Sequence, residues 1–327
     1  MRRWIVWIIC LCLLAGGTAL CTIRWKAWFA NPYEPEWTEP EIAYQFVTFD
    51  NDSVLHALQR DTLSFILLGD VHNSLSNSDL LLLTERYDDV HFWAQLGDFM
   101  ERPYQYYEQQ MYLSLIGTRL ETLPIVAIPG NHEYLKGIVK TLPSQWKTIF
   151  PNPANGPQRF LGTSYFVDFP HMRLIAIDTD GLQRISDYTQ VAFWLKKVLR
   201  EAHDRFAVVM MHHPIYSTAD GRCNPMLWMN FHSAMREADV VFSGHDHNYT
   251  RRTVQYKARF WKKEQPTVFI ATNASDKVYP IKQYYNYDAR FTGEAVCEYI
   301  TVTADTLSIS TYLIHSGEQI DNVIITH

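Results

Sequence analysis

The sequence predicts an α/β fold in which short buried strands alternate with helices. Five short apolar runs stop abruptly and are followed at once by polar residues: "LSFILLGDVHN", "VHFWAQLGDFMER", "LPIVAIPGNHEY", "FAVVMMHHPIYS" and "VVFSGHDHNYTR". Segments with helical spacing, residues 79–87, 104–120, 189–200 and 226–238, lie between these runs. Short strands joined by helices are typical of βαβ units with parallel strands.

The composition is that of a globular protein with a large core. The chain has 327 residues, of which 47% are hydrophobic and 20% are charged, and either one large domain or two small ones would fit. The net charge of -6 and the pI of about 6.1 indicate no nucleic-acid partner, because a general nucleic-acid binder carries a basic excess.

The amino terminus begins with a long uncharged segment. Residues 4–23, "WIVWIICLCLLAGGTALCTI", are enough to cross a bilayer as a helix. The alternative is a signal peptide cleaved after Ala19, but the run exceeds the usual signal core of about 7–15 residues, which favours an uncleaved anchor. Arg2 and Arg3 indicate that the amino terminus stays in the cytoplasm. The rest of the chain would then lie outside the cytoplasm, in the periplasm or the extracellular space. If the segment is cleaved, the rest of the chain would be secreted.

The remaining chain divides into a spacer and a folded domain. We expect residues 1–25 to form the anchor or signal peptide, residues 26–41 a stiff spacer rich in proline and glutamate, and residues 42–327 the domain, with residues 42–49 as its first strand. The domain contains two cysteines, Cys223 and Cys297. Outside the cytoplasm they could form a disulfide, and two buried free thiols are the alternative.

The polar residues that follow the apolar runs predict a metal site. Parallel strands point their carboxyl ends the same way, so these side chains should converge on one rim of the sheet. They are Asp70, His72, Asp98, Asn131, His212, His245 and His247. Carboxylate, amide and imidazole groups without cysteine suit Mn²⁺, Fe or Zn²⁺. The set exceeds the needs of one ion and predicts two, with Asp98 as the bridging carboxylate.

The five motifs, taken together and in order, carry a resemblance to a known family. "GDVH", "GDFMER", "GNHE", "MHHP" and "GHDH" resemble the calcineurin-like metallophosphoesterases, and the likeness covers residues 63–251. The resemblance implies a β-sandwich of two mixed sheets flanked by helices (αββα) over residues 42–327. The β-rich tail, residues 267–327, would complete the second sheet.

The same resemblance assigns the ligands to two ions. One ion would be held by Asp70, His72, Asp98 and His247, and the other by Asp98, Asn131, His212 and His245. His132 matches the family's catalytic histidine beside the substrate, which is not a ligand. In "MHHP" the first histidine matches the family's ligand, so His213 is expected to lie outside the coordination sphere.

Two subfamilies resemble parts of the chain. "GHDHNYTR" is similar to purple acid phosphatases, but those lack a histidine at the position of His72 and have a metal-binding tyrosine where Glu101 stands, so we expect no coloured iron–tyrosinate centre. "GDFMER" and "GNHE" are similar to serine/threonine protein phosphatases, which implies that Arg102 contacts the substrate phosphate. A salt bridge to a neighbouring helix is the alternative role for Arg102.

The resemblance and the ligand set predict a phosphoesterase. Two cations would lower the pKa of a water between them, so that a bridging hydroxide attacks the phosphate while His132 protonates the leaving oxygen. The rival function is a non-catalytic metal-binding or scaffold protein on the same fold. A membrane-surface module in the aromatic segment 282–291 could coexist with catalysis, although half-buried sheet residues explain its tyrosines better. The substrate could be a phosphorylated small molecule, lipid or protein.

Overall fold

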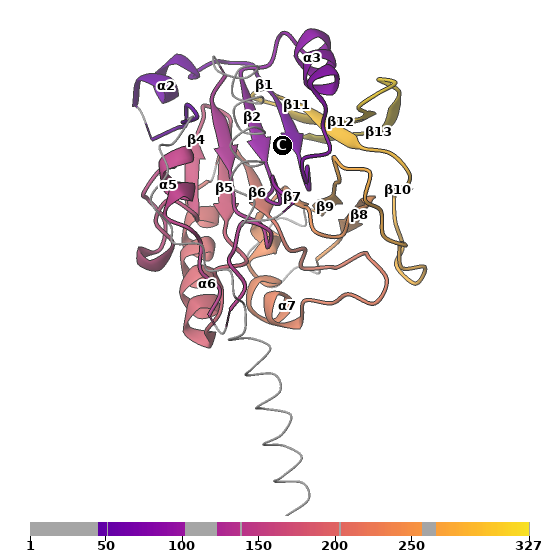
Figure 1. Ribbon diagram of the computed structural model, residues 1–327. Coiled ribbons are helices and arrows are strands. Elements are labelled where there is room, and N and C mark those ends of the chain that lie inside the picture. The colour runs from indigo at the N-terminus through magenta and orange to yellow at the C-terminus, as the bar shows by residue number, and fades with distance from the viewer. Residues whose placement is uncertain are drawn as a thin grey trace, which may run out of the picture. The chain divides into compact units, whose positions relative to one another are not determined.

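The structure is a computed structural model that describes residues 45–50, 52–101, 123–137, 139–202, 204–256 and 266–326 (Figure 1). The predicted anchor and spacer, Arg102 and the predicted helix 104–120 lie outside the described residues. Within the described ranges, no helix combines the length and the apolar character that a membrane span requires.

Among the described residues, the first sheet has six strands in the order β13-β12-β11-β1-β2-β3 (Figure 1). The bounds are Leu63–Leu68 for β1, Phe92–Gln95 for β2, Ile125–Ala127 for β3, Val296–Val302 for β11, Thr306–Leu313 for β12 and Gln319–Thr326 for β13. Strands β1, β2 and β3 are parallel, whereas β11, β12 and β13 form an antiparallel meander that joins the sheet beside β1.

In the part of the chain that the structure describes, the second sheet has seven strands in the order β10-β8-β9-β7-β6-β5-β4. The bounds are Tyr165–Asp168 for β4, Met172–Ile177 for β5, Phe206–Met211 for β6, Val240–Ser243 for β7, Tyr249–Val254 for β8, Thr267–Ala271 for β9 and Ala289–Phe291 for β10. Strands β5, β6, β7 and β9 are parallel to one another, and β4, β8 and β10 pair antiparallel. Both sheets are therefore mixed, as the resemblance implied.

The helices flank the two sheets. They are α2 (Asp52–Ala57), α3 (Asn77–Arg86), α5 (Gln145–Ile149), α6 (Ile185–Arg200) and α7 (Pro225–Phe231), with 3-10 turns at Gln158–Phe160 and Met235–Glu237. Ser76 begins α3 with a capping box: its hydroxyl accepts from the backbone of Asp79, whose carboxylate accepts from the backbone of Ser76. The predicted helix over 226–238 is broken into α7 and a separate 3-10 turn.

The main core lies between the two sheets. Alternate residues of β1, such as Phe65 and Leu67, pack in one cluster with Val208 of β6 and Phe242 of β7. Ile66 of β1 faces the other way and packs with Leu80 and Leu83 of α3. The period of two expected for a strand thus places one face of the first sheet against the second sheet and the other face under helices.

Three expectations need correction. Residues 45–49 form no strand, although the backbone N–H of Phe46 donates to Ile149 and the carbonyl of Val47 accepts from Ile125. The tail does not complete one sheet, because β9 and β10 join the second sheet and β11 to β13 the first. In segment 282–291 only Ala289–Phe291 is a strand, so its tyrosines are not sheet residues.

The two cysteines of the domain are both free thiols. Cys297 is buried, but Cys223 is exposed. Neither alternative from the sequence is therefore fully correct, because the thiols do not pair and only one of them is buried.

Candidate metal centre

All seven predicted ligands follow the carboxyl ends of parallel strands. Asp70 and His72 follow β1, Asp98 follows β2, Asn131 follows β3, His212 follows β6, and His245 and His247 follow β7. The strand pattern alone had predicted that these side chains would lie on one rim of a single sheet. The strands instead belong to two sheets. The centre is therefore formed where the parallel ends of both sheets meet.

The backbone at the ligands is strained. Five predicted ligands have positive φ without being glycine: Asp70 (53°), His72 (48°), Asp98 (51°), His245 (69°) and His247 (48°). Each such residue costs on the order of 1 kcal/mol or more, and strain of this kind clusters at functional sites. The fold accepts this cost where it turns the ligands toward a common point.

The motif glycines allow the loops to approach one another closely. A Cβ on Gly130 would lie 2.3 Å from Oδ1 of Asp98 and 2.9 Å from Cε1 of His212. A Cβ on Gly244 would lie 2.8 Å from Oδ2 of Asp70. Any side chain at these two positions would displace the predicted ligands, so the glycines of "GNHE" and "GHDH" are explained by close packing.

One cluster of possible ligands contains Asp70, His72, Asp98 and His247, all buried. Oδ1 of Asp70 lies 4.0 Å from Nε2 of His72 and 4.0 Å from Nε2 of His247. Nε2 of His72 lies 3.4 Å from Oδ2 of Asp98. These four residues are the set that the resemblance assigned to the first ion.

A second cluster contains His212, His213 and His245. Nε2 of His212 lies 3.2 Å from Oδ1 of Asn131 and 3.3 Å from Oδ2 of Asp98. The same carboxylate oxygen of Asp98 thus lies between the two clusters, as a shared ligand would require. The resemblance places His213 outside the coordination sphere, and its ring lies in the same group of possible ligands as those of His212 and His245.

The chemistry of the donors fits divalent cations. Both carboxylate oxygens of Asp70 are buried without a hydrogen-bond partner, and burial raises the pKa of this carboxyl to about 8. Burial also lowers the pKa of His247 to about 2, which leaves the imidazole in the neutral form that binds metal. A cation bound to Asp70 would favour its charged form and would compensate the buried oxygens.

A buried carboxylate connects the loops that carry the ligands after β2 and β3. Glu133 accepts hydrogen bonds from the backbone N–H groups of Asp98 (2.8 Å), Gly130 (2.7 Å), Phe99 (2.7 Å) and Met100 (3.3 Å). The glutamate of "GNHE" therefore positions the backbone of both loops rather than binding a cation.

Asp246 has a similar role in the turn between His245 and His247, and the sequence analysis missed it. Its carboxylate accepts hydrogen bonds from Ser217, Thr218 and Ala219, in the loop that follows "MHHP". The sequence did contain a signal that Asp246 matters, because Asp246 stands between two predicted ligands. Its side chain nevertheless points away to tie two loops together.

Glu101 contacts both histidines at the edge of the first cluster. Its Oε2 lies 2.8 Å from Nδ1 of His72, and its backbone carbonyl accepts from Nδ1 of His132. Nε2 of His132 then lies 4.0 Å from Oδ2 of Asp98, and 18% of the side chain is exposed. His132 is thus partly open to solvent at the edge of the centre, whereas the position of Arg102 is not described.

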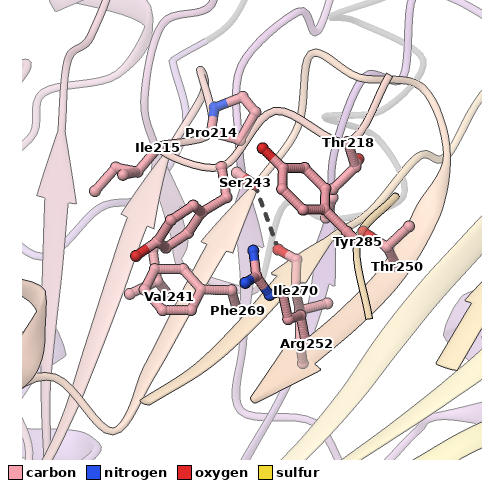
Figure 2. Close-up of a pocket in the computed structure, with 12 residues that line it drawn as sticks. Pro214, Ile215, Thr218, Val241, Ser243, Thr250, Arg252, Phe269, Ile270 and Tyr285 are labelled. Atoms are coloured by element: carbon pink, nitrogen blue, oxygen red, sulfur yellow. Dashed lines mark hydrogen bonds between the residues drawn. The ribbon is translucent and has the colours of Figure 1, made fainter. Parts of the chain in front are cut away.

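A separate pocket lies beside the loop that follows His213, next to β7, β8 and β9 (Figure 2). Arg252 lies between two aromatic rings there, 5.0 Å from the ring of Tyr216 and 4.8 Å from that of Tyr285. None of the seven predicted ligands lines this pocket. It is therefore distinct from the candidate metal centre.

Comparisons with known proteins agree with the site. The calcineurin-like phosphoesterase family matches residues 63–249. The chain is 25% identical over 198 residues to the glycerophosphodiester phosphodiesterase GpdQ of Enterobacter lignolyticus, and this alignment covers 56% of the chain and 66% of GpdQ.

Two solved structures share the fold. The purple acid phosphatase PPD1 of yellow lupin has a TM-score of 0.66 and 16% identity over 82% of this chain and 54% of the lupin chain. GAP50, the anchor in the inner membrane complex of Plasmodium, has a TM-score of 0.54 and 15% identity over 82% of this chain and 89% of its own. The chain thus spans just under two thirds of GpdQ and about half of the lupin enzyme.

Proposed function

Because the chain belongs to the calcineurin-like phosphoesterase family, we propose that it is a metal-dependent hydrolase of phosphate esters with a centre for two divalent cations, drawn from Mn²⁺, Fe and Zn²⁺. The family match, GpdQ and the lupin phosphatase all support a hydrolase that acts on phosphoester bonds.

One observation carries this proposal: the position of Asp98 between the two clusters. Its Oδ2 lies 3.4 Å from Nε2 of His72 and 3.3 Å from Nε2 of His212. A single carboxylate oxygen at similar distances from two groups of imidazoles could bind both of two ions about 3.5–4 Å apart, which supports the proposal. When bound, such ions would supply an activated water and neutralise phosphate oxygens.

The chain's own residues supply the remaining steps. His132 is held through Nδ1, so its Nε2 is available to donate a proton or a hydrogen bond to the leaving oxygen. The backbone N–H of His132 donates to Oδ1 of Asp98 at 2.8 Å, which joins the loop that carries the proposed acid to the loop that carries the proposed shared ligand. The buried ligands exclude bulk water from the inner side of the centre.

The substrate belongs to the phosphate esters. GpdQ is named as a phosphodiesterase and the lupin protein as a phosphatase, so both diesters and monoesters are proposed candidates. The likeness to GpdQ, at 25% identity over 198 residues, favours diesters.

The test uses the full chain purified in detergent, stripped of metal and reconstituted with Mn²⁺ or Zn²⁺. We expect close to two ions per chain by elemental analysis, and metal-dependent hydrolysis of bis(nitrophenyl) phosphate or nitrophenyl phosphate. One ion or none would contradict the dinuclear centre. Two ions without hydrolysis of any ester would favour the scaffold alternative.

We also propose that residues 1–25 anchor the chain in a membrane through the spacer 26–41, with the domain 42–327 outside the cytoplasm. The uncharged run over residues 4–23 and the charges of Arg2 and Arg3 support this location. Protease added to cells whose cytoplasmic membrane is intact, but whose outer layers have been removed, should degrade the domain. Protection of the domain, with degradation only after lysis, would reverse the proposed orientation.

A further inference from the structure

Arg252 of β8 carries a positive charge that no acidic side chain offsets. Among the described residues, no carboxylate forms an ion pair with its guanidinium, whereas its neighbour Arg251 pairs with both Asp321 and Asp288. Nη1 of Arg252 is also buried without a hydrogen-bond partner in the described part of the chain. Buried donors in folded proteins are nearly always satisfied, and a charged one is the most costly to leave alone. This guanidinium therefore suits an acceptor from outside the chain.

The two tyrosines that flank Arg252 do not supply that acceptor. An aromatic face attracts a cation, but it offers no lone pair to an N–H group. The rings of Tyr216 and Tyr285 therefore stabilise the charge of Arg252 and leave its N–H groups available. Tyr216 is held in place, because its hydroxyl lies 2.8 Å from Nδ1 of His232 and its ring packs edge-on to Phe269 at 4.9 Å. One side of the site is thus already formed.

The guanidinium of Arg252 opens into the pocket beside β7, β8 and β9 (Figure 2). Arg252 is the one charged residue that lines this pocket. The hydroxyl of Ser243 also lines it and lies 3.5 Å from the carbonyl oxygen of Ile270, which is too long for a strong hydrogen bond and leaves the hydroxyl able to contact a ligand. The rest of the lining is mostly apolar and buried: Pro214, Ile215, Val241, Phe269, Ile270 and Ala271.

We propose that this pocket binds a small organic carboxylate, with the carboxylate at Arg252 and the apolar part against β7 and β9. The planar fork of an arginine matches the two oxygens of a carboxylate. A single negative charge equals the single positive charge of the lining, whereas a phosphate dianion would keep one charge without a partner. A buried water would accept from Nη1 but would not offset the charge. The site does not depend on the proposed metal centre, because none of the predicted ligands lines it.

The experiment uses butyrate as the probe, because butyrate joins a carboxylate to a short apolar chain. Binding to the full chain in detergent, loaded with Zn²⁺, is measured by saturation-transfer difference NMR and is measured again after the metal is removed. We expect binding that persists without metal. Butanol should bind about 10-fold or more weakly than butyrate, because it lacks the charge-assisted hydrogen bonds, and butylamine should not bind.

The variant Arg252→Gln should weaken butyrate binding by about 10-fold or more, since it removes the cation and its fork of donors. Arg290→Gln, at an exposed arginine of β10, is the matched control and should bind butyrate as the parent does. Equal butyrate affinity in a folded Arg252→Gln variant and in the parent would overturn the inference.

A photoreactive probe locates the site in the parent chain, so the test also holds if circular dichroism shows that Arg252→Gln does not fold. A short-chain carboxylate that carries a diazirine should label the loop 214–218 or strand β9, and excess butyrate should prevent the labelling. Labelling only elsewhere, equal binding of butanol and butyrate, or butyrate binding that disappears with the metal would each overturn the inference. None of these outcomes would affect the proposed hydrolase function.

Discussion

Oε2 of Glu133 accepts a hydrogen bond from the backbone N–H of Asp98 at 2.8 Å. The same oxygen accepts from Gly130 at 2.7 Å, so one buried carboxylate joins the loop after β2 to the loop after β3. The first loop supplies Asp98, the proposed shared ligand, and the second supplies Asn131 and His132, the proposed acid. Glu133 therefore fixes the position of Asp98 relative to His132, although Glu133 itself is proposed neither as a ligand nor as the acid.

The variant Glu133→Gln should therefore destabilise the metal-free protein by about 2–4 kcal/mol. The amide has one acceptor oxygen in place of two, and its NH₂ group would face backbone N–H groups that need an acceptor. Urea unfolding in the presence of a chelator measures the change. Glu294→Gln, at an exposed position, should leave stability unchanged, and equal stability of the two variants would remove the proposed role.

Replacement of the shared ligand tests the dinuclear centre directly. Asp98→Asn keeps the size of the side chain but removes its negative charge. In the parent, Oδ2 of Asp98 lies 3.3 Å from Nε2 of His212 and 3.4 Å from Nε2 of His72. Both ions should bind more weakly and hydrolysis should be lost. Metal titration and activity assays measure this, with Asp305→Asn, at an exposed position, as the control. Loss of only one ion would show that Asp98 is not shared.

The sequence was sufficient to predict that the candidate ligands follow the ends of short apolar strands. Asp70, Asp98 and His245 each follow a glycine at the end of an apolar run, and such a run followed by a turn is a local signal. The family match over residues 63–249 confirms the predicted family. The roles of the individual residues as ligands stay predictions, although the structure brings all seven together around Asp98.

The parts that could not be predicted depend on contacts between distant segments. The contact between His213 and Asp180 joins the loops after β6 and β5, and "MHHP" alone does not show which histidine faces the centre. The division of the tail between two sheets depends on pairing of β11 with β1, which are more than 200 residues apart. Local propensity carries no information about such pairings.

Glu298 predicts a pH dependence of stability away from the ligands. This residue of β11 is buried, and burial raises the pKa of its carboxyl from 4.5 to about 8, with the hydroxyl of Thr272 opposing part of the effect. The folded protein favours the protonated form of Glu298, and this preference adds to the free energy of unfolding. The added stability is complete below about pH 4.5 and is lost as the pH rises through 8. Glu298→Gln stays neutral, so it should lose less stability than the parent as the pH rises.

The difference between Glu298→Gln and the parent should amount to a few kcal/mol between about pH 5 and 9, because a tenfold change in a proton-binding constant corresponds to roughly 1.4 kcal/mol. Urea unfolding of the metal-free proteins at several pH values measures it, and subtraction removes the titration of groups common to both. Parallel stability curves would show that the carboxyl of Glu298 titrates normally.

His132 separates catalysis from metal binding. Its Nδ1 contacts the carbonyl oxygen of Glu101, its Nε2 lies 4.0 Å from Oδ2 of Asp98, and its ring is partly exposed. It also forms a third group of possible ligands with His72 and Glu101, so the test must distinguish a proton donor from a ligand. His132→Ala should keep both ions yet lose about 10²–10⁴-fold in kcat, or roughly 3–5 kcal/mol of barrier. The loss should be large for an alkyl phosphate and small for a nitrophenyl phosphate, because nitrophenolate needs little protonation. Metal content and kcat of both proteins on both esters are the measurements. Equal losses on the two esters would replace the general-acid role with phosphate positioning, and loss of metal would make His132 a ligand.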